Sequence, residues 1–256
     1  MKSGRGQYEE VNLMNIVIPV VSFTVSFVFA LCGLGSAIAL IPILVILGVP
    51  FTYARSAGLF VNVVTTLSVT FYNIQSGFFK PKIALPVIIS SIAFAPIGAF
   101  VSISIPSKIV GFAFVSFLIF VVITTTLPIG RFKGKEKISI PILIFIGALS
   151  GFLSGLLGVG GGGVILPLLL LFGMNPKIAI TVTPLSVPFS SLTSFITYVH
   201  LGGVDWEVIV FASIPAMISG YLAGYVAHRK LKLATVRKIL VTILLLIAVR
   251  FILKFL

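Results

Sequence analysis

The stretch that decides the fold is GLLGVGGGGVILP, residues 155–167, in which five of the six residues from Gly158 to Gly163 are glycine. A glycine inside a helix lowers the stability of that helix by about 1 kcal/mol relative to alanine. The tract therefore predicts a break between two helices. Backbone groups at such a break are costly in hydrocarbon, so the break must be surrounded by protein or line a wet cavity.

The composition around this tract is that of a membrane protein. The 256 residues are 59% hydrophobic and 9% charged, with a mean hydropathy of +1.25, whereas soluble domains are about one quarter charged. The net charge of +13 comes mainly from basic residues in short breaks between apolar runs, which is typical of cytoplasmic loops and argues against nucleic-acid binding. The single cysteine, Cys32, excludes a thiolate metal cluster within the chain, and we expect no metal or cofactor.

The chain also contains an internal repeat. Moving it by 125 residues places Gly33 on Gly158 and Gly35 on Gly160, and further small or turn residues coincide without a gap. The apolar runs have the same order in both halves. They lie near 15–32, 36–48, 56–78, 83–104 and 108–129, and near 140–157, 161–173, 180–201, 207–228 and 235–255.

We therefore predict an all-α polytopic membrane protein with about 8–10 transmembrane segments. Residues 1–130 form the first repeat, 131–139 a basic cytoplasmic linker and 140–256 the second repeat. The linker and the basic loop 229–238 are placed inside, the acidic loop 202–207 outside. The two repeats then have inverted topology, each with a glycine-broken helix pair and three long spans, as in secondary transporters.

The breaks and the spans that follow them supply the candidate site. A helix that starts at a glycine break directs free N–H groups and its positive dipole end at an anion. Close helix packing is the alternative explanation of these glycines. Hydroxyl and amide groups crowd into one span of each half, where they are candidates for the walls of a pathway. The predicted substrate-binding residues are Gly33, Gly35, Ser36, Asn62, Thr65, Thr66, Gly160, Gly161, Gly162, Gly163, Thr181, Thr183, Ser190, Ser191 and Ser194.

Charged residues favour an anion as the solute. The five acidic residues are all terminal or in predicted loops, which argues against a carboxylate proton relay or sodium site within the membrane. We expect Arg55 and Lys177 in connections at the two mouths, where they either recruit anions or simply lie at the interface. We expect Tyr198 and Trp206 to be interfacial anchors.

The string GFLSGLLGVGGGGVILPLLLLFGMNPKIAITVTPLS resembles the TauE/SafE family, the sulfite exporter or toluene sulfonate uptake permeases. The resemblance rests on Gly158 to Gly163, Pro167, Gly173, and Ala179 with Thr181 and Thr183. The first half, CGLGSAIALIPILVILGVPFTYARSAG, is a weaker copy. The resemblance implies transport of sulfite, sulfoacetate or other organosulfonates across the cytoplasmic membrane.

The sequence thus predicts a secondary transporter of small sulfur-containing oxyanions, not an enzyme, in which the two repeats rock to expose the site alternately. Protons carried with the substrate are a candidate for coupling. The alternatives are an anion channel with the same lining and a non-transporting membrane subunit. The direction of transport and the oligomeric state stay open.

Overall fold

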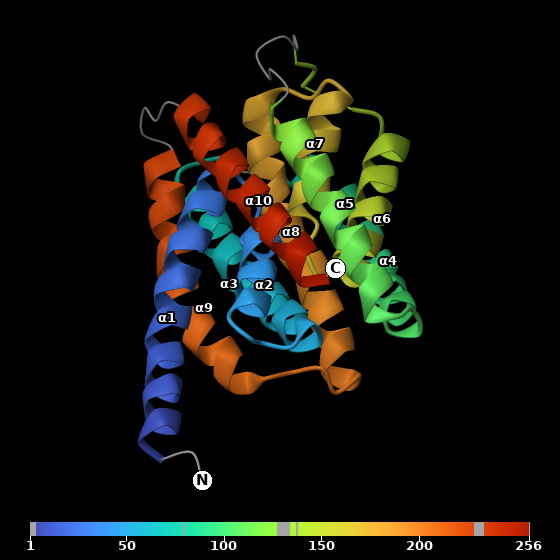
Figure 1. Cartoon of the computed structure of the whole chain (residues 1–256). Coiled ribbons are helices and arrows are strands. Elements are labelled where there is room, and N and C mark those ends of the chain that lie inside the picture. The colour runs from blue at the N-terminus through green and yellow to red at the C-terminus, as the bar shows by residue number, and fades with distance from the viewer. Residues whose placement is uncertain (1–3, 79, 127–133, 137, 228–232, 256) are drawn as a thin grey trace.

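The computed structural model describes the backbone of residues 4–78, 80–126, 134–136, 138–227 and 233–255, and the side chains of 16–78, 80–126, 134–136, 138–227 and 238–250. Ten α-helices and no named strand occur in these described ranges (Figure 1). The helices are α1 (Gly4–Leu31), α2 (Ala37–Ile46), α3 (Phe51–Gln75), α4 (Pro81–Ser104), α5 (Ser107–Thr126), α6 (Ile140–Leu157), α7 (Gly162–Leu171), α8 (Pro176–His200), α9 (Trp206–Ala227) and α10 (Leu233–Phe255).

Each helix corresponds to one predicted apolar run, and the all-helical membrane fold is confirmed. Six helices, α3, α4, α5, α6, α8 and α9, are long and apolar enough to cross a bilayer. The starts of α3 and α8 differ from the prediction. These helices begin at Phe51 and Pro176, about one turn earlier than the predicted runs near 56 and 180. Arg55 and Lys177 consequently lie inside helices and not in connections. Residues 131–133, 137 and 229–232 of the predicted basic loops lie outside the described residues.

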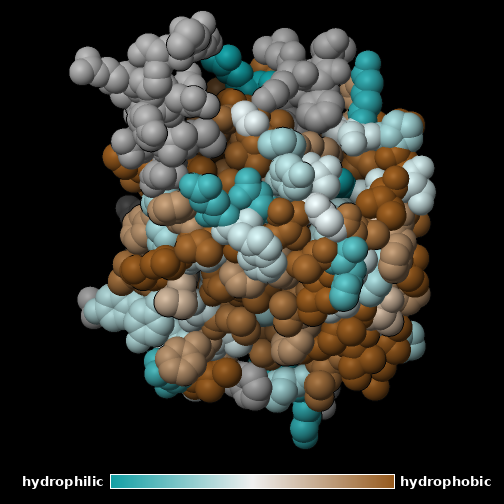
Figure 2. Space-filling model, turned by 90° about the horizontal axis from the view of Figure 1, so that it is seen from below, coloured by the Kyte–Doolittle hydropathy of each residue, from teal (hydrophilic) through white to brown (hydrophobic). Residues whose placement is uncertain are grey.

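The distribution of polarity is inverted relative to a soluble protein. Large apolar side chains such as Ile89, Phe100 and Leu246 are exposed, whereas Asn62 and Ser191 are fully buried. Figure 2 shows hydrophobic side chains over much of one end of the molecule, with hydrophilic residues in smaller patches between them. Soluble monomers do not expose apolar surface on this scale, so the outer surface faces lipid and the polar residues face the interior.

The ends of the bundle are distinguished by charge. The backbone of Lys135 forms a bridge with Met174, just after α7, and α6 starts at Ile140, so α6 and α7 form a hairpin that begins and ends on this side. We call it the basic end, since Lys80, Lys135 and Lys177 lie there. Figure 1 shows the α8–α9 connection at the other end of the bundle, here called the opposite end.

Helix packing reproduces the sequence repeat. The packed pair α4–α6 has its counterpart in α9–α1, and α3–α9 has its counterpart in α8–α4. Equivalent helices α3 and α8 pack directly and run antiparallel, because Thr70 bonds to Pro184, Asn62 to Ser191, and Arg55 stacks on Tyr198. Antiparallel equivalents are what oppositely oriented repeats require. The inverted relation itself stays a prediction, which this packing supports.

A row of small residues in α6, which the sequence analysis did not single out, sets the closest helix contact. Gly147, Gly151 and Gly155 recur every four residues and face α4. A Cβ at Gly151 would overlap the carbonyl oxygen of Ser91, and one at Gly155 would overlap that of Ala95. Small residues at this spacing let membrane helices approach closely, and here they hold the first helix of one repeat against the other repeat.

Replacing Gly151 with alanine is expected to destabilise the protein by about 1–3 kcal/mol, because an overpacked site forces backbones apart. Thermal unfolding of the purified protein in detergent measures the effect. Ile144→Ala, on the same helix but 47% exposed, serves as the control and should change the unfolding temperature little. Equal effects of both substitutions would show that the α4–α6 contact is not tightly packed.

Candidate functional site

The break between α6 and α7 is a sharp, buried turn made by glycine. Helix α6 ends at Leu157 and α7 starts at Gly162. Gly158, Gly160 and Gly161 have φ angles of +81°, +74° and +65°, values that glycine adopts without the steric cost other residues incur. The predicted break is therefore confirmed, although it is shorter than the glycine tract, since Gly162 and Gly163 already belong to α7.

The break between α1 and α2 has the same construction and lies against the first one. Gly33 and Gly35 have φ angles of +71° and +82°, and α2 starts at Ala37. A Cβ on Gly162 would overlap the carbonyl oxygen of Leu34, so the two breaks are in direct backbone contact. Helices α2 and α7 are each about 15 Å long, half of the hydrocarbon thickness of about 30 Å. Each can carry the chain only from one end to this central contact.

The carboxamide of Asn62, from the middle of α3, lies between the two breaks. Its Nδ2 donates to the carbonyl oxygen of Gly160 at 3.3 Å and to Oγ of Ser191 at 2.9 Å. A Cβ added at Gly35 or at Gly160 would overlap this carboxamide. The Oδ1 atom of Asn62 is buried and has no hydrogen-bond partner in the described part of the chain. Asn62 thus joins both repeats and keeps one polar atom free.

Buried hydroxyl groups surround this centre. Ser36 Oγ lies 3.4 Å from Thr65 Oγ1. At the equivalent place in the second repeat, a Cβ on Gly161 would lie 3.0 Å from Oγ of Ser190 and 2.8 Å from Oγ of Ser150. The hydroxyl of Ser150 is buried without a partner, a state that leaves its full desolvation cost uncompensated unless a solute or water binds it.

The backbone adds further donors at the same place. The N–H groups of Gly33 and Gly158 donate to carbonyl groups in the last turns of α1 and α6. Those of Ala39 and Val164 donate to the carbonyl groups of the residues just before α2 and α7. Between them, the N–H group of Leu34 bonds to Phe29 and that of Gly162 to Gly160, and the others take no part in the backbone hydrogen bonds that the structure describes outside its helices. These are the amides of Gly35, Ser36, Ala37 and Ile38, and of Val159, Gly160, Gly161 and Gly163.

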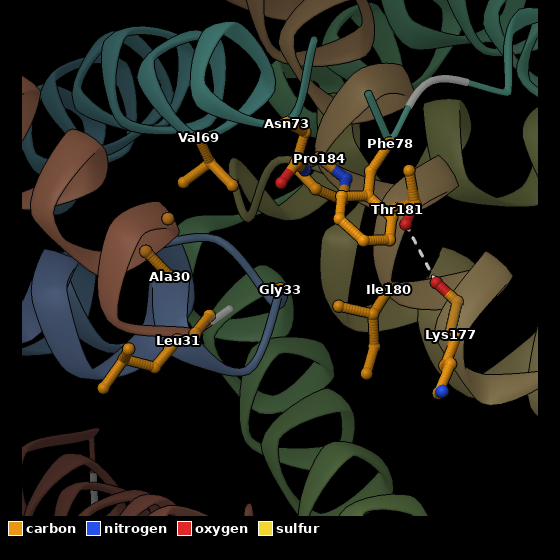
Figure 3. A pocket seen from close by; sticks show the side chains of 12 residues that line it. Ala30, Leu31, Gly33, Val69, Asn73, Phe78, Lys177, Ile180, Thr181 and Pro184 are labelled. Carbon is orange, nitrogen blue, oxygen red and sulfur yellow. Dashed lines mark hydrogen bonds between the residues drawn. The ribbon is translucent and has the colours of Figure 1, made fainter. Parts of the chain in front are cut away.

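A cavity of about 290 Å³ leads from the basic end to the first break. Lys177 and Thr181 line it from the first turns of α8, Asn73 from α3, and Gly33 from the break. Figure 3 shows the loop with Gly33 facing Ile180, and a hydrogen bond from the Thr181 hydroxyl to the carbonyl oxygen of Lys177. Lys177 is exposed, so a cation lies at the mouth of this cavity.

Arg55 and Tyr198 differ from the sequence-based prediction. Arg55 is only 3% exposed, and Tyr198 is fully buried and donates its hydroxyl to the carbonyl oxygen of Gly155. Neither side chain is therefore exposed, as that of an interfacial residue would be. The apolar pattern could not reveal this, because the start of α3 packs under the ends of α4, α6 and α8. Trp206, at the start of α9, is 58% exposed as an anchor would be.

The structure gathers part of the predicted set and separates the rest. Residues in contact at the centre are Gly35, Ser36, Asn62, Thr65, Gly160, Gly161, Ser190 and Ser191. Gly163 packs against Ile38 and Phe117, Gly162 against the Leu34 backbone, and Gly33 and Thr181 line the cavity. The hydroxyls of Thr66 and Thr183 bond to carbonyls of their own helices.

Two hydroxyls on α6 complete the site and were missed from the sequence. Ser150 lies next to Gly161, and Ser154 Oγ lies 3.3 Å from Ser194 Oγ. The two serines are four residues apart, one and two turns before the break, which is a signal that the sequence contains. The repeat comparison hid it, because the equivalent positions are Val25 and Phe29.

Comparison with known proteins agrees with this architecture. A family model described as "Sulfite exporter TauE/SafE" matches residues 18–251. A protein of Bacillus subtilis named "Probable membrane transporter protein" is 28% identical over 260 residues, which covers 91% of this chain and 95% of the relative. A Methanocaldococcus jannaschii protein with the same description is 26% identical over 256 residues, covering 93% and 95%.

A plant relative matches a shorter segment. "Sulfite exporter TauE/SafE family protein 6" of Arabidopsis thaliana is 34% identical over 94 residues, which is 37% of this chain and 21% of the relative. No solved structure gives a significant match.

Proposed function

The chain belongs to the TauE/SafE family of membrane transporters, and on that premise we propose that it carries small sulfur-containing oxyanions across the cytoplasmic membrane. Sulfite, sulfoacetate and other organosulfonates are the proposed solutes. The observation that carries the proposal is the meeting of two glycine breaks around Asn62, where unpaired backbone amides and buried hydroxyls converge.

The donors at the centre suit a tetrahedral or pyramidal oxyanion. Backbone N–H groups at the starts of α2 and α7 add the positive ends of two helix dipoles, which favour negative charge. Ser150 and Ser190 supply hydroxyl groups beside Gly161. A sulfonate or sulfite group presents several acceptor oxygens, so one solute can bond to donors of both repeats simultaneously.

The placement of carboxylates argues against a cation as the solute. Among the described side chains, the acidic residues are Glu136, Asp205 and Glu207, which all lie outside the middle of the helices. A bound cation at the centre would have no fixed counter-charge, and a buried ion without one is costly. Lys177, at the mouth of the cavity, instead raises the local concentration of anions.

Alternating access follows from the repeat. Helices α3 and α8 cross antiparallel at Asn62 and Ser191, so rocking one repeat against the other would pivot at the proposed site. The cavity extends to Gly33 of the first break from the basic end, which the positive-inside rule assigns to the cytoplasm. Movement of a proton with the anion would reduce the net charge transferred, and we include this coupling in the proposal.

Flux measurements in proteoliposomes test the proposal. We expect saturable uptake of sulfite or of an organosulfonate that is accelerated by the same anion on the other side, and that responds to a pH gradient. Large unitary currents would favour the channel, and a purified protein that moves none of these anions would favour the non-transporting subunit. An anion flux that does not depend on the pH gradient would disprove the proton coupling but not the transport of the anion.

A further inference from the structure

Arg55 is a buried cation whose partners are all neutral. Its Nη1 donates to Oγ of Ser102 and to the carbonyl oxygen of Leu156, the latter at 3.3 Å. Its guanidinium carbon lies 4.7 Å from the ring centroid of Phe51 and 5.0 Å from that of Tyr198. The start of α3 is thereby tied to the ends of α4, α6 and α8.

The charge of Arg55 is not balanced by a carboxylate. None of the described acidic residues forms an ion pair with it, and its Nε atom is buried without a hydrogen-bond partner. A charged side chain inside a membrane protein is costly and calls for a functional explanation. Hydrogen bonds and cation–π contacts offset part of that cost, but the guanidinium keeps a donor available for an anion.

The sequence repeat shows what Arg55 replaces. The 125-residue shift relates residues that line the cavity at the basic end to residues around Arg55. Ile180 corresponds to Arg55 and Thr181 to Ser56. The same operation maps Asn73 onto Tyr198 and Ala227 onto Ser102. The residues that line an open cavity in one half thus correspond to a closed cluster in the other half, where all four side chains are at most 3% exposed.

We propose that Arg55 is the gate at the opposite end of the pathway, closed here by its bonds to Ser102 and Leu156 and opened when an anion takes their place. This inference rests on the proposed function. Arg55 precedes Asn62 by seven residues, or about 10 Å along one face of α3, and Gly158 of the second break contacts the Arg55 side chain. Once Arg55 is released from Ser102, an anion bound to its guanidinium would therefore lie close to the central site.

Opening has a defined energetic requirement. When α3 moves away from α4 and α6, Arg55 loses both of its acceptors and its positive charge must find new ones. Removing the partners of a buried charge is strongly unfavourable. An oxyanion restores charge-assisted hydrogen bonds to the guanidinium, which are about twice as strong as neutral ones. The open state is then stabilised by the transported anion, and an empty carrier stays closed at this end.

Cysteine accessibility tests the gate without any measurement of flux. In a Cys32→Ala background, Ser56→Cys reports on the opposite end and Thr181→Cys on the cavity at the basic end. A membrane-impermeant maleimide is added to membrane vesicles of each orientation. The anion probe is methanesulfonate, because sulfite itself reacts with thiol reagents.

With Arg55 intact, we expect Thr181→Cys to be labelled and Ser56→Cys to be protected. Arg55→Gln should raise the labelling rate at Ser56→Cys about a hundredfold, since two hydrogen bonds to a charged group are lost, and lower the rate at Thr181→Cys. Arg55→Lys should give a smaller rise, because it keeps the charge without the planar fork. Methanesulfonate should raise labelling at Ser56→Cys with Arg55 intact and have no effect with Arg55→Gln.

The variant Ser102→Ala removes one acceptor of Arg55 and keeps the charge, and it should also raise labelling at Ser56→Cys. Unchanged protection in Arg55→Gln, or a rise at both reporter positions, would overturn the gate. An absence of any methanesulfonate effect in the protein with Arg55 would overturn the role of the anion. A gate that responds to methanesulfonate in a protein that carries no sulfur anion would instead overturn the proposed function and leave the gate intact.

Discussion

Replacing Asn62 with aspartate is expected to reduce the flux of sulfite or organosulfonates about a thousandfold. The two side chains have nearly the same shape, but aspartate places a negative charge between the two glycine breaks, where Asn62 now donates to Gly160 and Ser191. Like charges about 4 Å apart repel by about 4 kcal/mol at the effective dielectric constant of a protein site, which corresponds to roughly three powers of ten in binding. Initial flux rates in alkaline buffer, where the carboxylate is ionised, measure the loss.

Asn175→Asp is the matched control for this substitution. Asn175 caps α8 by accepting a hydrogen bond from the backbone N–H of Lys177, and aspartate caps helices equally well. The same chemical change, made beside Lys177 and away from the central site, should reduce the flux far less than Asn62→Asp. If Asn62→Asp retained normal flux, the anion would have to bind elsewhere, and the central site would be disproved.

Replacing Gly160 with alanine is expected to have the second largest effect, a loss of flux of about a hundredfold. The added Cβ would overlap Nδ2 of Asn62 and approach Oγ of Ser191 to 2.7 Å. Both side chains would have to move, and the breaks would separate. The φ angle of +74° adds a steric cost of about 1–2 kcal/mol for any residue other than glycine.

The two effects of this substitution are separated by Gly173→Ala. Gly173 has a φ angle of +85° but nothing within 4 Å of an added Cβ, so it carries the backbone cost alone. Thermal unfolding should therefore shift in both variants, while flux per folded molecule should fall only in Gly160→Ala. Equal flux in the two variants would mean that the contact with Asn62 is not needed for transport.

Much of the architecture can be predicted from hydropathy and from the spacing of glycine and proline. The 125-residue offset of Gly33 and Gly158 gives the order of the ten helices, and both short helices begin within one residue of the predicted positions. These features are local. A glycine tract breaks a helix wherever it occurs, and an apolar run must face lipid or the core whatever its neighbours are.

The starts of α3 and α8 were the weak point of the prediction. The sequence between Gly48 and Ser56 and between Gly173 and Ile180 contains polar and charged residues, which resemble a connection. Tertiary packing extends α3 into its segment, because Arg55 bonds there to Ser102 and Leu156 and lies against two aromatic rings. Helix α8 starts early because Asn175 caps it and Pro176 is its first residue. No sequence pattern shows that a buried arginine will meet such partners.

The sequence by itself determined that this chain is a helical membrane protein with two glycine breaks, and it predicted two similar halves in which polar side chains are most crowded in one long helix. Only the tertiary structure decided that the breaks touch, that Asn62 lies between them, and that Arg55 is enclosed at one end while its repeat equivalent lines a cavity at the other. The physical reason is distance along the chain. Asn62 and Ser191 are 129 residues apart, and they meet only because α3 and α8 cross antiparallel, an outcome of packing that no local pattern encodes.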